Sequence, residues 1–346
     1  MSNQETLYQD SISIRKLPIN FNQADLALFE HELKREIPAT TLLHLEEINI
    51  NSDGILFRGS RILPESFVTP KFWGPKAKLK FFVRLFRHIL FRHIDIDRIN
   101  SDVFWITDNW SQPYFHWMTD ALPRLFTIRE KITRATLLLP GAYQRVDYIT
   151  SSLEPFFVQE VKFINGIIRY RSLRIPTHTA PTGNYNENII RGLRSLFTDF
   201  YQSAHRYRNC AGDKIYISRG KAQKRKIVNE EDLVAILKEY GFKTVYFEDY
   251  PFEEQVKIAL DAQYLISNHG AGLTNMLFMK SGSSVFELRQ KGDSHNNCYF
   301  ALASSLNLRY FYQTCHSENP DEDAHTANLI VDCQLLRKNI EQMLTT

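Results

Sequence analysis

The strongest local pattern for chemistry is a glycine-containing turn between a strand and a helix. The apolar run Tyr264–Ser267 predicts a buried strand, and Ala271–Met279 predicts the helix that follows. Gly270 and Gly272 would let the backbone approach a ligand closely, with amides turned toward it at the positive end of the helix. This arrangement suits a diphosphate. A turn that only packs a helix on a strand has the same pattern, so the glycines alone do not decide between the two interpretations.

A cluster of cations follows a second predicted strand, Lys214–Ser218, at the same expected edge of the sheet. Arg219 comes directly after that strand, and its planar guanidinium matches phosphate oxygens. We predict phosphate binding by Arg219, with Lys224 and Arg225 as helpers, and an exposed basic loop is the alternative. Glu287 ends the next strand after the glycine turn, where its carboxylate could accept the two hydroxyls of a ribose or form a salt bridge.

A third pattern lies in the first half of the chain, where the apolar spacing of Tyr114–Glu130 predicts a helix. His116 and Asp120 would lie one turn apart on one face. A carboxylate at this spacing can orient an imidazole and favour its protonated form, which is the arrangement of a general base and its helper. Tyr114 and Trp117 beside them could stack on sugar rings. The alternative is an amphipathic helix whose histidine belongs to the core.

Alternating strands and helices must position these residues. From about residue 102 onward, the alternation implies βαβ units, a parallel sheet and ligands at the carboxyl ends of its strands, so we predict an α/β protein. The further predicted strands are Val103–Thr107, Ala135–Leu139, Ile167–Leu173, Phe242–Phe247 and Ser284–Leu288. The further predicted helices are Asn229–Tyr240, with Asn229 as its N-cap, Phe252–Asp261 and Cys333–Leu344.

At 346 residues the chain is long enough for two domains of ordinary size. The clearest linker is Pro176–Asn184, which is rich in proline, threonine and glycine. We therefore predict an N-terminal, acceptor-side domain over residues 1–178, a C-terminal, nucleotide-binding domain over 186–330 and a C-terminal helix over 331–346. The first hundred residues predict little beyond short strands.

The composition, with 43% hydrophobic and 23% charged residues, is that of a soluble globular protein. A net charge of +3 is too small to indicate nucleic acid as a partner. The cysteines show no CxxC or Cys/His spacing, so neither a zinc site nor a disulfide framework is expected. The N-terminus lacks a signal-peptide pattern, and no apolar run approaches the roughly 18–20 residues that span a bilayer. We expect a cytoplasmic protein.

The basic stretch 76–92 predicts an amphipathic helix with aromatic and aliphatic residues on one side. Its apolar side either packs on the protein's own domain or enters the headgroup layer of an anionic membrane. The second interpretation would make the protein a peripheral one at the inner face of the membrane.

Six short motifs occur in order along the chain. They are His116–Asp120 (HWMTD), Leu122–Arg124 (LPR), Tyr216–Arg219 (YISR), Phe252–Val256 (FEEQV), His269–Asn275 (HGAGLTN) and Val285–Glu287 (VFE). The ordered set resembles glycosyltransferase family 61, over roughly Val103 to Leu288. This group contains bacterial enzymes of the capsular-polysaccharide type, plant arabinoxylan xylosyltransferases and animal O-linked N-acetylglucosaminyltransferases. The set is far more specific than any single motif.

The resemblance implies a GT-B fold, in which two Rossmann-like domains face each other across a cleft. It also implies an inverting transfer of a sugar from a nucleotide diphosphate donor such as a UDP-sugar, with no metal or other cofactor. The acceptor would be a hydroxyl of a glycan or lipid-linked glycan in bacterial surface polysaccharide synthesis, of capsule or lipopolysaccharide. Because the chain is shorter than eukaryotic members and lacks a membrane anchor, a protein acceptor of the secretory pathway is not expected.

By motif position the predicted site residues fall into two sets. His116 or Asp120 would be the catalytic base that takes the proton of the acceptor hydroxyl. The acceptor-side residues are Asn109, Tyr114 and Trp117. The residues that would bind the donor nucleotide are Arg219, Lys224, Arg225, His269, Gly270, Ala271, Gly272, Leu273, Thr274 and Glu287.

Two other functions fit parts of the sequence. A GT-A enzyme would hold a metal on a DxD motif, for which Asp95 and Asp97 are the candidates, although they follow a basic helix rather than a core strand. A catalytically silent nucleotide- or glycan-binding protein would keep the glycine turn and Arg219 and would lack the pair His116 and Asp120, which this chain retains.

Overall fold

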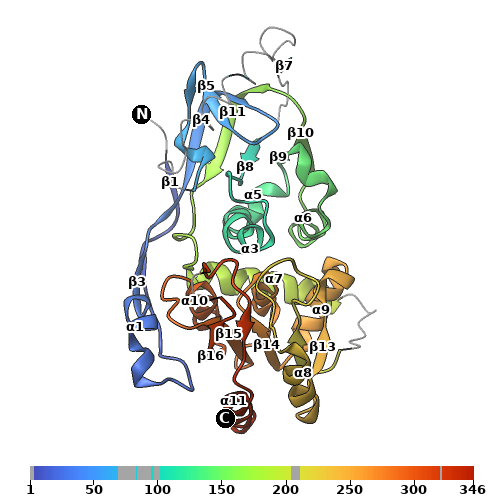
Figure 1. The fold of residues 1–346 in the computed structure, drawn as a ribbon. Coiled ribbons are helices and arrows are strands. Elements are labelled where there is room, and N and C mark those ends of the chain that lie inside the picture. Colours follow the sequence, from blue (N-terminus) through green and yellow to red (C-terminus); the bar gives the residue numbers. More distant parts are fainter. Residues whose placement is uncertain (1–3, 69–82, 84–94, 97–101, 204–210, 320–321) are drawn as a thin grey trace. The chain divides into compact units, whose positions relative to one another are not determined.

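The computed structural model describes residues 4–68, 83, 95–96, 102–203, 211–319 and 322–346. The chain forms two compact units. Unit 1 comprises Met1–Asp10 and Pro38–Thr182, and unit 2 comprises Ser11–Ile37 and Gly183–Thr346. Each unit combines helices with a β-sheet, so the predicted α/β class is confirmed (Figure 1).

Unit 1 is built on a nine-stranded mixed sheet. Its strands are β1 (Glu5–Tyr8), β4 (Thr40–Ile50), β5 (Leu56–Arg58), β6 (Arg61–Ile62), β7 (Asp95–Ile96), β8 (Val103–Trp105), β9 (Thr136–Pro140), β10 (Glu160–Ile164) and β11 (Ile168–Pro176). β10, β9, β8 and β11 are parallel neighbours in that order, and β4 then pairs antiparallel with β11. β9 is buried along its whole length, as expected of a strand that is covered on both faces.

The predicted helix over residues 114–130 is interrupted by one wide turn. Pro123 has no backbone N–H to donate to the carbonyl of Thr119, which favours a local departure from α-helical geometry. π-Helical turns are rare and often occur at functional sites. The parts are α3 (Tyr114–His116), the π-helical turn Trp117–Ala121, α4 (Leu122–Thr127) and α5 (Arg129–Ile132).

Unit 2 contains a six-stranded sheet in the order β13, β12, β14, β15, β16, β17. The strands are β12 (Lys214–Ile217), β13 (Lys243–Val245), β14 (Tyr264–Asn268), β15 (Ser284–Gln290), β16 (Arg309–Ser317) and β17 (Leu329–Ile330). All pairs are parallel except β16 with β17. β13, the next strand along the chain, pairs with one side of β12, and β14 then pairs with the other side. The strand order therefore reverses between β12 and β14. Such a switch point is where open α/β sheets bind ligands.

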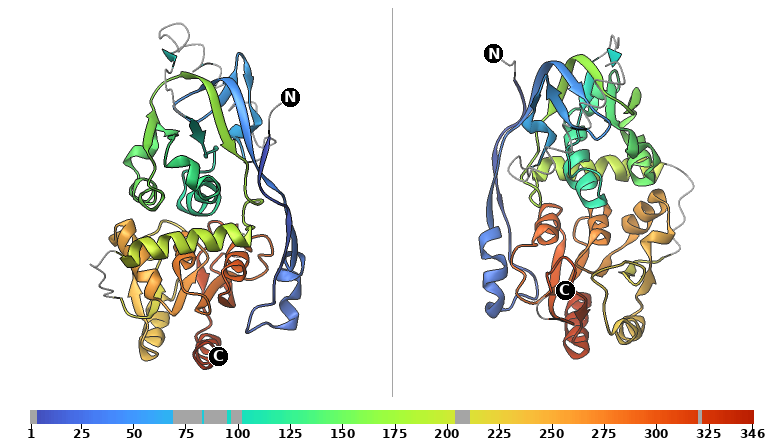
Figure 2. Two further views of the ribbon diagram at one scale, coloured as in Figure 1. Left: turned by 180° about the vertical axis from the view of Figure 1, so that it is seen from behind. Right: turned by 45° about the horizontal axis from the view of Figure 1, so that its top comes forward.

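Helices flank this sheet (Figures 1 and 2). On one face, side chains of α8 and α11 such as Leu237 and Ile340 pack with Ile266 and Phe286 in a single buried cluster. α7, α9 and the segment after the glycine turn meet through the rings of Phe197, Phe252 and Phe278. The helices are α7 (Glu187–Ser203), α8 (Glu230–Glu239), α9 (Phe252–Asp261), α10 (Cys298–Ser305) and α11 (Cys333–Thr345).

An N-terminal segment, which the sequence assigned to the first domain, belongs to unit 2 in the structure. It contains the antiparallel strands β2 (Ser11–Ile14) and β3 (Lys34–Ile37). The ring of Phe29 in this segment is fully buried and lies 5.0 Å from that of Phe300 and 4.9 Å from that of Tyr312. These contacts join residues far apart in the chain, which local periodicity does not reveal.

Several elements of unit 2 differ from the prediction. α7, α10 and β16 were not predicted. The helix predicted over Ala271–Met279 is present as a 3-10 helix, Ala271–Phe278. Asn229 does not cap α8, because its side-chain amide donates to the carbonyl of Val331 at 2.9 Å and accepts from the amide of Val331 at 3.0 Å. Asn229 therefore ties the start of α8 to the segment that follows β17.

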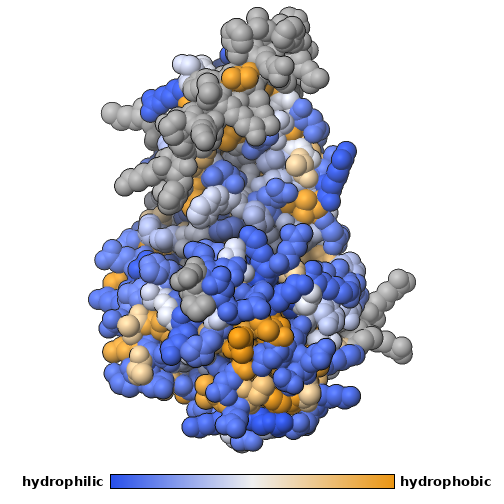
Figure 3. Space-filling view, viewed as in Figure 1, coloured by the Kyte–Doolittle hydropathy of each residue, from blue (hydrophilic) through white to orange (hydrophobic). Residues whose placement is uncertain are grey.

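Two predictions concern residues outside the described part of the chain. The basic stretch 76–92 lies outside it except for Val83, and so does Asp97. Asp95 belongs to β7, whose backbone pairs with β11. Among the described residues, the helices are too short or too polar to cross a bilayer. The face in Figure 3 is mainly hydrophilic, with hydrophobic residues in small patches.

Candidate active site

The carboxyl ends of β12 and β14 bring two predicted groups together at the switch point of unit 2. The two strands are parallel neighbours with Ile217 opposite Ser267, so the residues that follow them emerge at the same edge of the sheet. Arg219 follows the first strand, and the turn from His269 to Gly272 follows the second.

Because the two glycines of this turn have no side chain, other side chains can pack closely against them. A Cβ on Gly270 would overlap the Arg219 guanidinium, with Cζ at only 2.9 Å. A Cβ on Gly272 would lie 2.9 Å from Cγ2 of Ile217 in β12. Gly270 therefore allows the arginine to lie against the turn, and Gly272 allows the turn to pack on the strand.

Arg219 lies close to a second arginine, Arg225, and few groups around the two offset their positive charges. The Nε atoms of Arg219 and Arg225 are buried, and the described residues offer neither a hydrogen-bond partner. Burial lowers the pKa of Arg219, and the nearby charge of Arg225 lowers it further. Arg225 also has a left-handed backbone (φ 57°), and its carbonyl accepts a hydrogen bond from the Asn268 side chain. Two partly buried cations that form no ion pair with a described residue make a candidate site for an anion.

The remaining residues that were predicted to bind the donor differ in their exposure and hydrogen bonds. The side chain of Lys224 is exposed, and its carbonyl accepts from Nη2 of Arg219 at 3.3 Å. Ala271 is partly buried. Leu273 and Thr274 are fully buried, and the amide of Leu273 donates to the carbonyl of Gly270 at 2.9 Å, so Leu273 belongs to the core.

The sequence suggested that Glu287 binds a ribose or forms a salt bridge, and in the structure its partners are side chains of the protein itself. It lies within β15 rather than at its end, and it is fully buried. One carboxylate oxygen is hydrogen-bonded to Nδ1 of His269, and the other accepts from the Tyr310 hydroxyl. Burial would raise the pKa of Glu287, but the charge and hydrogen bond of His269, with Arg289 nearby, hold it below its usual value. The carboxylate of Glu287 is therefore occupied by the imidazole of His269.

In unit 1 the wide turn holds the predicted acid–base pair together. Nδ1 of His116 lies 2.8 Å from Oδ2 of Asp120, which also accepts from the Thr182 hydroxyl at 3.2 Å. The Asp120 side chain is 4% exposed and that of His116 is 21% exposed. Since Nδ1 faces the carboxylate, Nε2 is the atom left for a substrate. The Trp110 ring lies 5.4 Å from the imidazole ring.

The predicted acceptor-side residues have unequal access to a ligand. Asn109 is exposed, and its side-chain oxygen accepts from the amide of Val68 at 3.2 Å. Tyr114 is partly exposed. Trp117 is fully buried, and its indole nitrogen donates to Ser152 at 2.8 Å, so it cannot stack on a sugar. Trp110, 38% exposed, is the aromatic residue beside His116 that the sequence interpretation passed over.

A second buried carboxylate in unit 1 was also missed. Oδ2 of Asp108 lies 3.0 Å from Nε2 of His178 and 3.6 Å from Nη1 of the buried Arg124. Burial would raise the pKa of Asp108, but His178 and Arg124 hold it below its usual value. Arg124 also interacts electrostatically with Asp120. Asp108 directly follows the predicted strand Val103–Thr107, so the rule that ligands bind at strand ends could have pointed to it.

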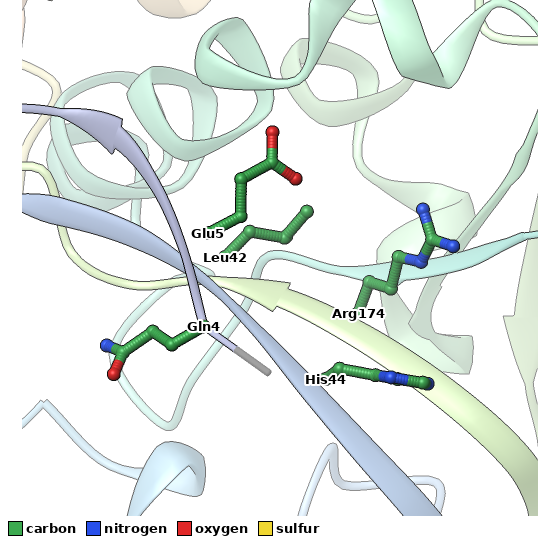
Figure 4. A pocket seen from close by; sticks show the side chains of 5 residues that line it. All are labelled: Gln4, Glu5, Leu42, His44 and Arg174. Atoms are coloured by element: carbon green, nitrogen blue, oxygen red, sulfur yellow. The ribbon is translucent and has the colours of Figure 1, made fainter. Parts of the chain in front are cut away.

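Two open pockets of unit 1 lie near β1 and β4. One, of about 500 Å³, has His178 and Thr182 in its wall, which are the partners of Asp108 and Asp120. The other, of about 340 Å³, contains none of the predicted residues. Figure 4 shows its lining side chains: Gln4 just before β1, Glu5 on β1, Leu42 and His44 on β4, and Arg174 on β11.

Metal ligands do not gather in the part of the chain that the structure describes. No group of three or more histidine, cysteine, aspartate or glutamate side chains there is arranged to hold a metal ion.

Unit 2 is thus a doubly wound α/β unit whose switch point carries a cationic turn, the class of site at which such sheets bind phosphate-bearing ligands. Comparison with known families gives the identity. The sequence profile of the family Glycosyltransferase 61 matches residues 114–286, which is half of the chain. The chain belongs to glycosyltransferase family 61. The predicted family and class of enzyme are confirmed.

Similar curated proteins carry related names. The chain is 34% identical over 121 residues to the EGF domain-specific O-linked N-acetylglucosamine transferase of Drosophila melanogaster, covering 32% of this chain and 23% of that protein. It is 33% identical over 140 residues to the Bos taurus protein of that name, covering 36% and 26%. It is 33% identical over 116 residues to Protein O-linked-mannose beta-1,4-N-acetylglucosaminyltransferase 2 of Bos taurus, covering 31% and 20%. The matches span about a quarter of these relatives.

The low pKa of Asp108 predicts a pH-dependent contribution to stability. A carboxylate whose pKa is lowered by folding stabilises the protein above its unfolded pKa of about 3.9, and this contribution is lost as pH falls through the folded value. We expect Asp108→Asn to lower the free energy of unfolding by about 2 kcal/mol at pH 7, and the difference to shrink below about pH 4. Urea unfolding at several pH values measures it. Glu154→Gln, at an exposed carboxylate of the same unit, is the control, and a pH-independent loss in Asp108→Asn would contradict the prediction.

Proposed function

We propose that this protein is an inverting glycosyltransferase that moves a sugar from a UDP-sugar to a hydroxyl of a glycan acceptor. The observation that carries the proposal is the partly buried guanidinium of Arg219 packed against Gly270 of the glycine turn, with the charge of Arg225 nearby. Membership of glycosyltransferase family 61 supports a nucleotide-sugar donor. The names of the relatives make N-acetylglucosamine the sugar to test first.

On the donor side, the diphosphate is the leaving group. When the bond between the anomeric carbon and the phosphate oxygen breaks, the electron pair stays on that oxygen. Arg219, Arg225 and the backbone amides of Gly270, Ala271 and Gly272 would stabilise this negative charge without a metal. Buried donors that are fixed before the reaction are effective because they need no reorganisation as the charge develops.

On the acceptor side, His116 is the proposed base. Asp120 orients its Nδ1, and Nε2 would take the proton from the acceptor hydroxyl as the new bond forms on the opposite face of the anomeric carbon. Trp110, beside the imidazole, offers an aromatic face for the acceptor sugar. The pocket that contains His178 and Thr182 is a further candidate for acceptor contacts.

The proposal includes a GT-B fold. It is supported by the doubly wound parallel sheet of unit 2 and by the parallel strands of unit 1, which resemble two Rossmann-like halves. We also propose that the protein acts in the cytoplasm, peripherally at the inner membrane through the stretch 76–92, on a lipid-linked glycan of a bacterial surface polysaccharide. The relatives named above are animal proteins whose names refer to EGF domains and O-linked mannose, so those acceptors are the alternatives to test.

Arg219 should be needed for donor binding. We expect Arg219→Gln to weaken the binding of UDP-N-acetylglucosamine about ten- to hundredfold, because a charge-assisted bidentate contact is lost. Isothermal titration calorimetry measures the affinity, and the ligand-induced rise in melting temperature provides a second readout. Lys221→Gln is the matched control, since Lys221 lies on the same loop and pairs with Asp249. Equal affinity in Arg219→Gln and the wild type would count against the proposed donor site.

His116 should affect turnover more than donor affinity. We expect His116→Ala to reduce the release of UDP from the nucleotide sugar about 10²- to 10⁴-fold, with nearly unchanged donor binding, because a general base acts on the chemical step. His44→Ala, at another histidine of unit 1, is the control. If His116→Ala keeps its turnover and Asp120→Asn loses it, Asp120 is the base instead.

Turnover should not depend on a metal. We expect the same rate of UDP release in excess EDTA, because the two arginines and the turn amides supply the positive charge that a metal would otherwise provide. An enzyme that stops in EDTA and recovers with Mg²⁺ or Mn²⁺ would instead follow the metal-dependent GT-A route through Asp95 and Asp97.

A further inference from the structure

His269 and Glu287 form a buried pair next to the glycine turn. His269 is the residue before Gly270, and its side chain is 13% exposed, whereas Glu287 is fully buried. Nδ1 of the imidazole meets one carboxylate oxygen, and Tyr310 donates to the other. Among the described residues, the ion pair of Glu287 is with His269 alone. The pair therefore leaves Nε2 as the nitrogen of His269 that can meet a ligand.

The anion site and this pair share a neighbour, Tyr299. Its ring lies 4.9 Å from the His269 ring in an edge-on arrangement. Arg219 and Arg225 both lie within electrostatic range of the Tyr299 side chain. His269 is thus part of the same cluster as the two arginines that line the anion site.

The other titratable groups around His269 are neutral or already engaged. Burial raises the pKa of Tyr299, Tyr310 and Cys298, so these groups carry no charge at neutral pH. The terminal nitrogens of Arg289 donate to Asn297 and to the carbonyl of Asp293. The charges that remain are the carboxylate of Glu287, which favours a charged imidazole by direct contact, and those of Arg219, Arg225 and Arg289, which oppose it.

We propose that Glu287 keeps His269 in its doubly protonated, positively charged form, so that His269 is a third cation of the donor diphosphate site. Direct contact with a buried carboxylate outweighs the more distant arginines, because a charge buried without a partner is strongly unfavourable. Glu287 is in this respect a positioning residue, and His269 is the group that meets the ligand. The inference rests on the proposed function for the identity of the anion.

A charged His269 has a consequence for the chemistry. With Nδ1 donating to Glu287, a neutral ring would carry a lone pair on Nε2 and would repel a phosphate oxygen. The charged ring instead carries an N–H there, which donates to the diphosphate. When the bond between sugar and diphosphate breaks, its electron pair stays on the phosphate oxygen and His269 keeps both of its protons.

The charge of His269 can be measured without any nucleotide. In the full-length protein labelled with ¹⁵N-histidine, the His269 signal is identified by its absence in His269→Gln. At pH 7.5 we expect both ring nitrogens of wild-type His269 to have the shifts of an imidazolium, and those of Glu287→Gln to have the shifts of a neutral ring. A neutral ring in the wild-type protein would overturn the proposal, whether or not the variant folds.

Donor affinity supplies a second readout that a merely structural role would not produce. We expect Glu287→Gln to weaken the binding of UDP-N-acetylglucosamine on the order of tenfold at pH 7.5, and the loss to become smaller at pH 5.5, where more of the imidazole is protonated without the carboxylate. The phosphates of a nucleotide sugar do not titrate in this range. A loss that is the same at both pH values would overturn the proposal.

Tyr310→Phe is the matched control, because it removes the other hydrogen bond of Glu287 and keeps the carboxylate charge. We expect its affinity to change less than about threefold and to show no recovery at low pH. If wild-type His269 is charged and the nucleotide sugar does not bind at all, the proposed function fails while the charge state stands. The two failures are therefore distinguishable.

Discussion

The candidate anion site of unit 2 depends on the close packing of the Arg219 guanidinium against Gly270. The contact requires that the ends of β12 and β14 be neighbours, which the reversal of strand order at this point of the sheet provides. It also requires a residue without a side chain, since a Cβ would occupy the position of the guanidinium. Together these conditions hold Arg219, with the charge of Arg225 nearby, in a partly buried position that favours an anion.

The same physical device recurs in both units. A carboxylate is buried, where it would be unfavourable alone, and it is paired with an imidazole that lies closer to solvent. The three pairs are Glu287 with His269, Asp120 with His116, and Asp108 with His178. In each, the carboxylate fixes one ring nitrogen and leaves the other side of the ring toward solvent or ligand. The protein thereby orients three imidazoles without exposing the carboxylates themselves.

Local periodicity predicted the elements whose own sequence pattern is clear without knowledge of their neighbours in the fold. The buried strands β9, β12, β14 and β15 were predicted within one or two residues at each end, because continuous apolar runs bounded by turns are typical of parallel strands. α7 was not predicted although it has 17 residues, and Ser11–Ile37 was assigned to the first domain. The place of that segment depends on contacts of Phe29 with the rings of Phe300 and Tyr312, and contacts between residues so far apart in the chain do not appear in the local sequence pattern.

The sequence by itself determined the family, the α/β class and the residue types of the candidate site, because these follow from ordered motifs and the alternation of strands and helices. Only the tertiary structure decided which side chains are free to act. Trp117 and Glu287 have the right chemistry, yet one is buried in the core and the other is occupied by His269 and Tyr310. The burial of a side chain and its hydrogen-bond partners depend on neighbours from distant parts of the chain. The type of a residue and its spacing within a motif therefore cannot specify them.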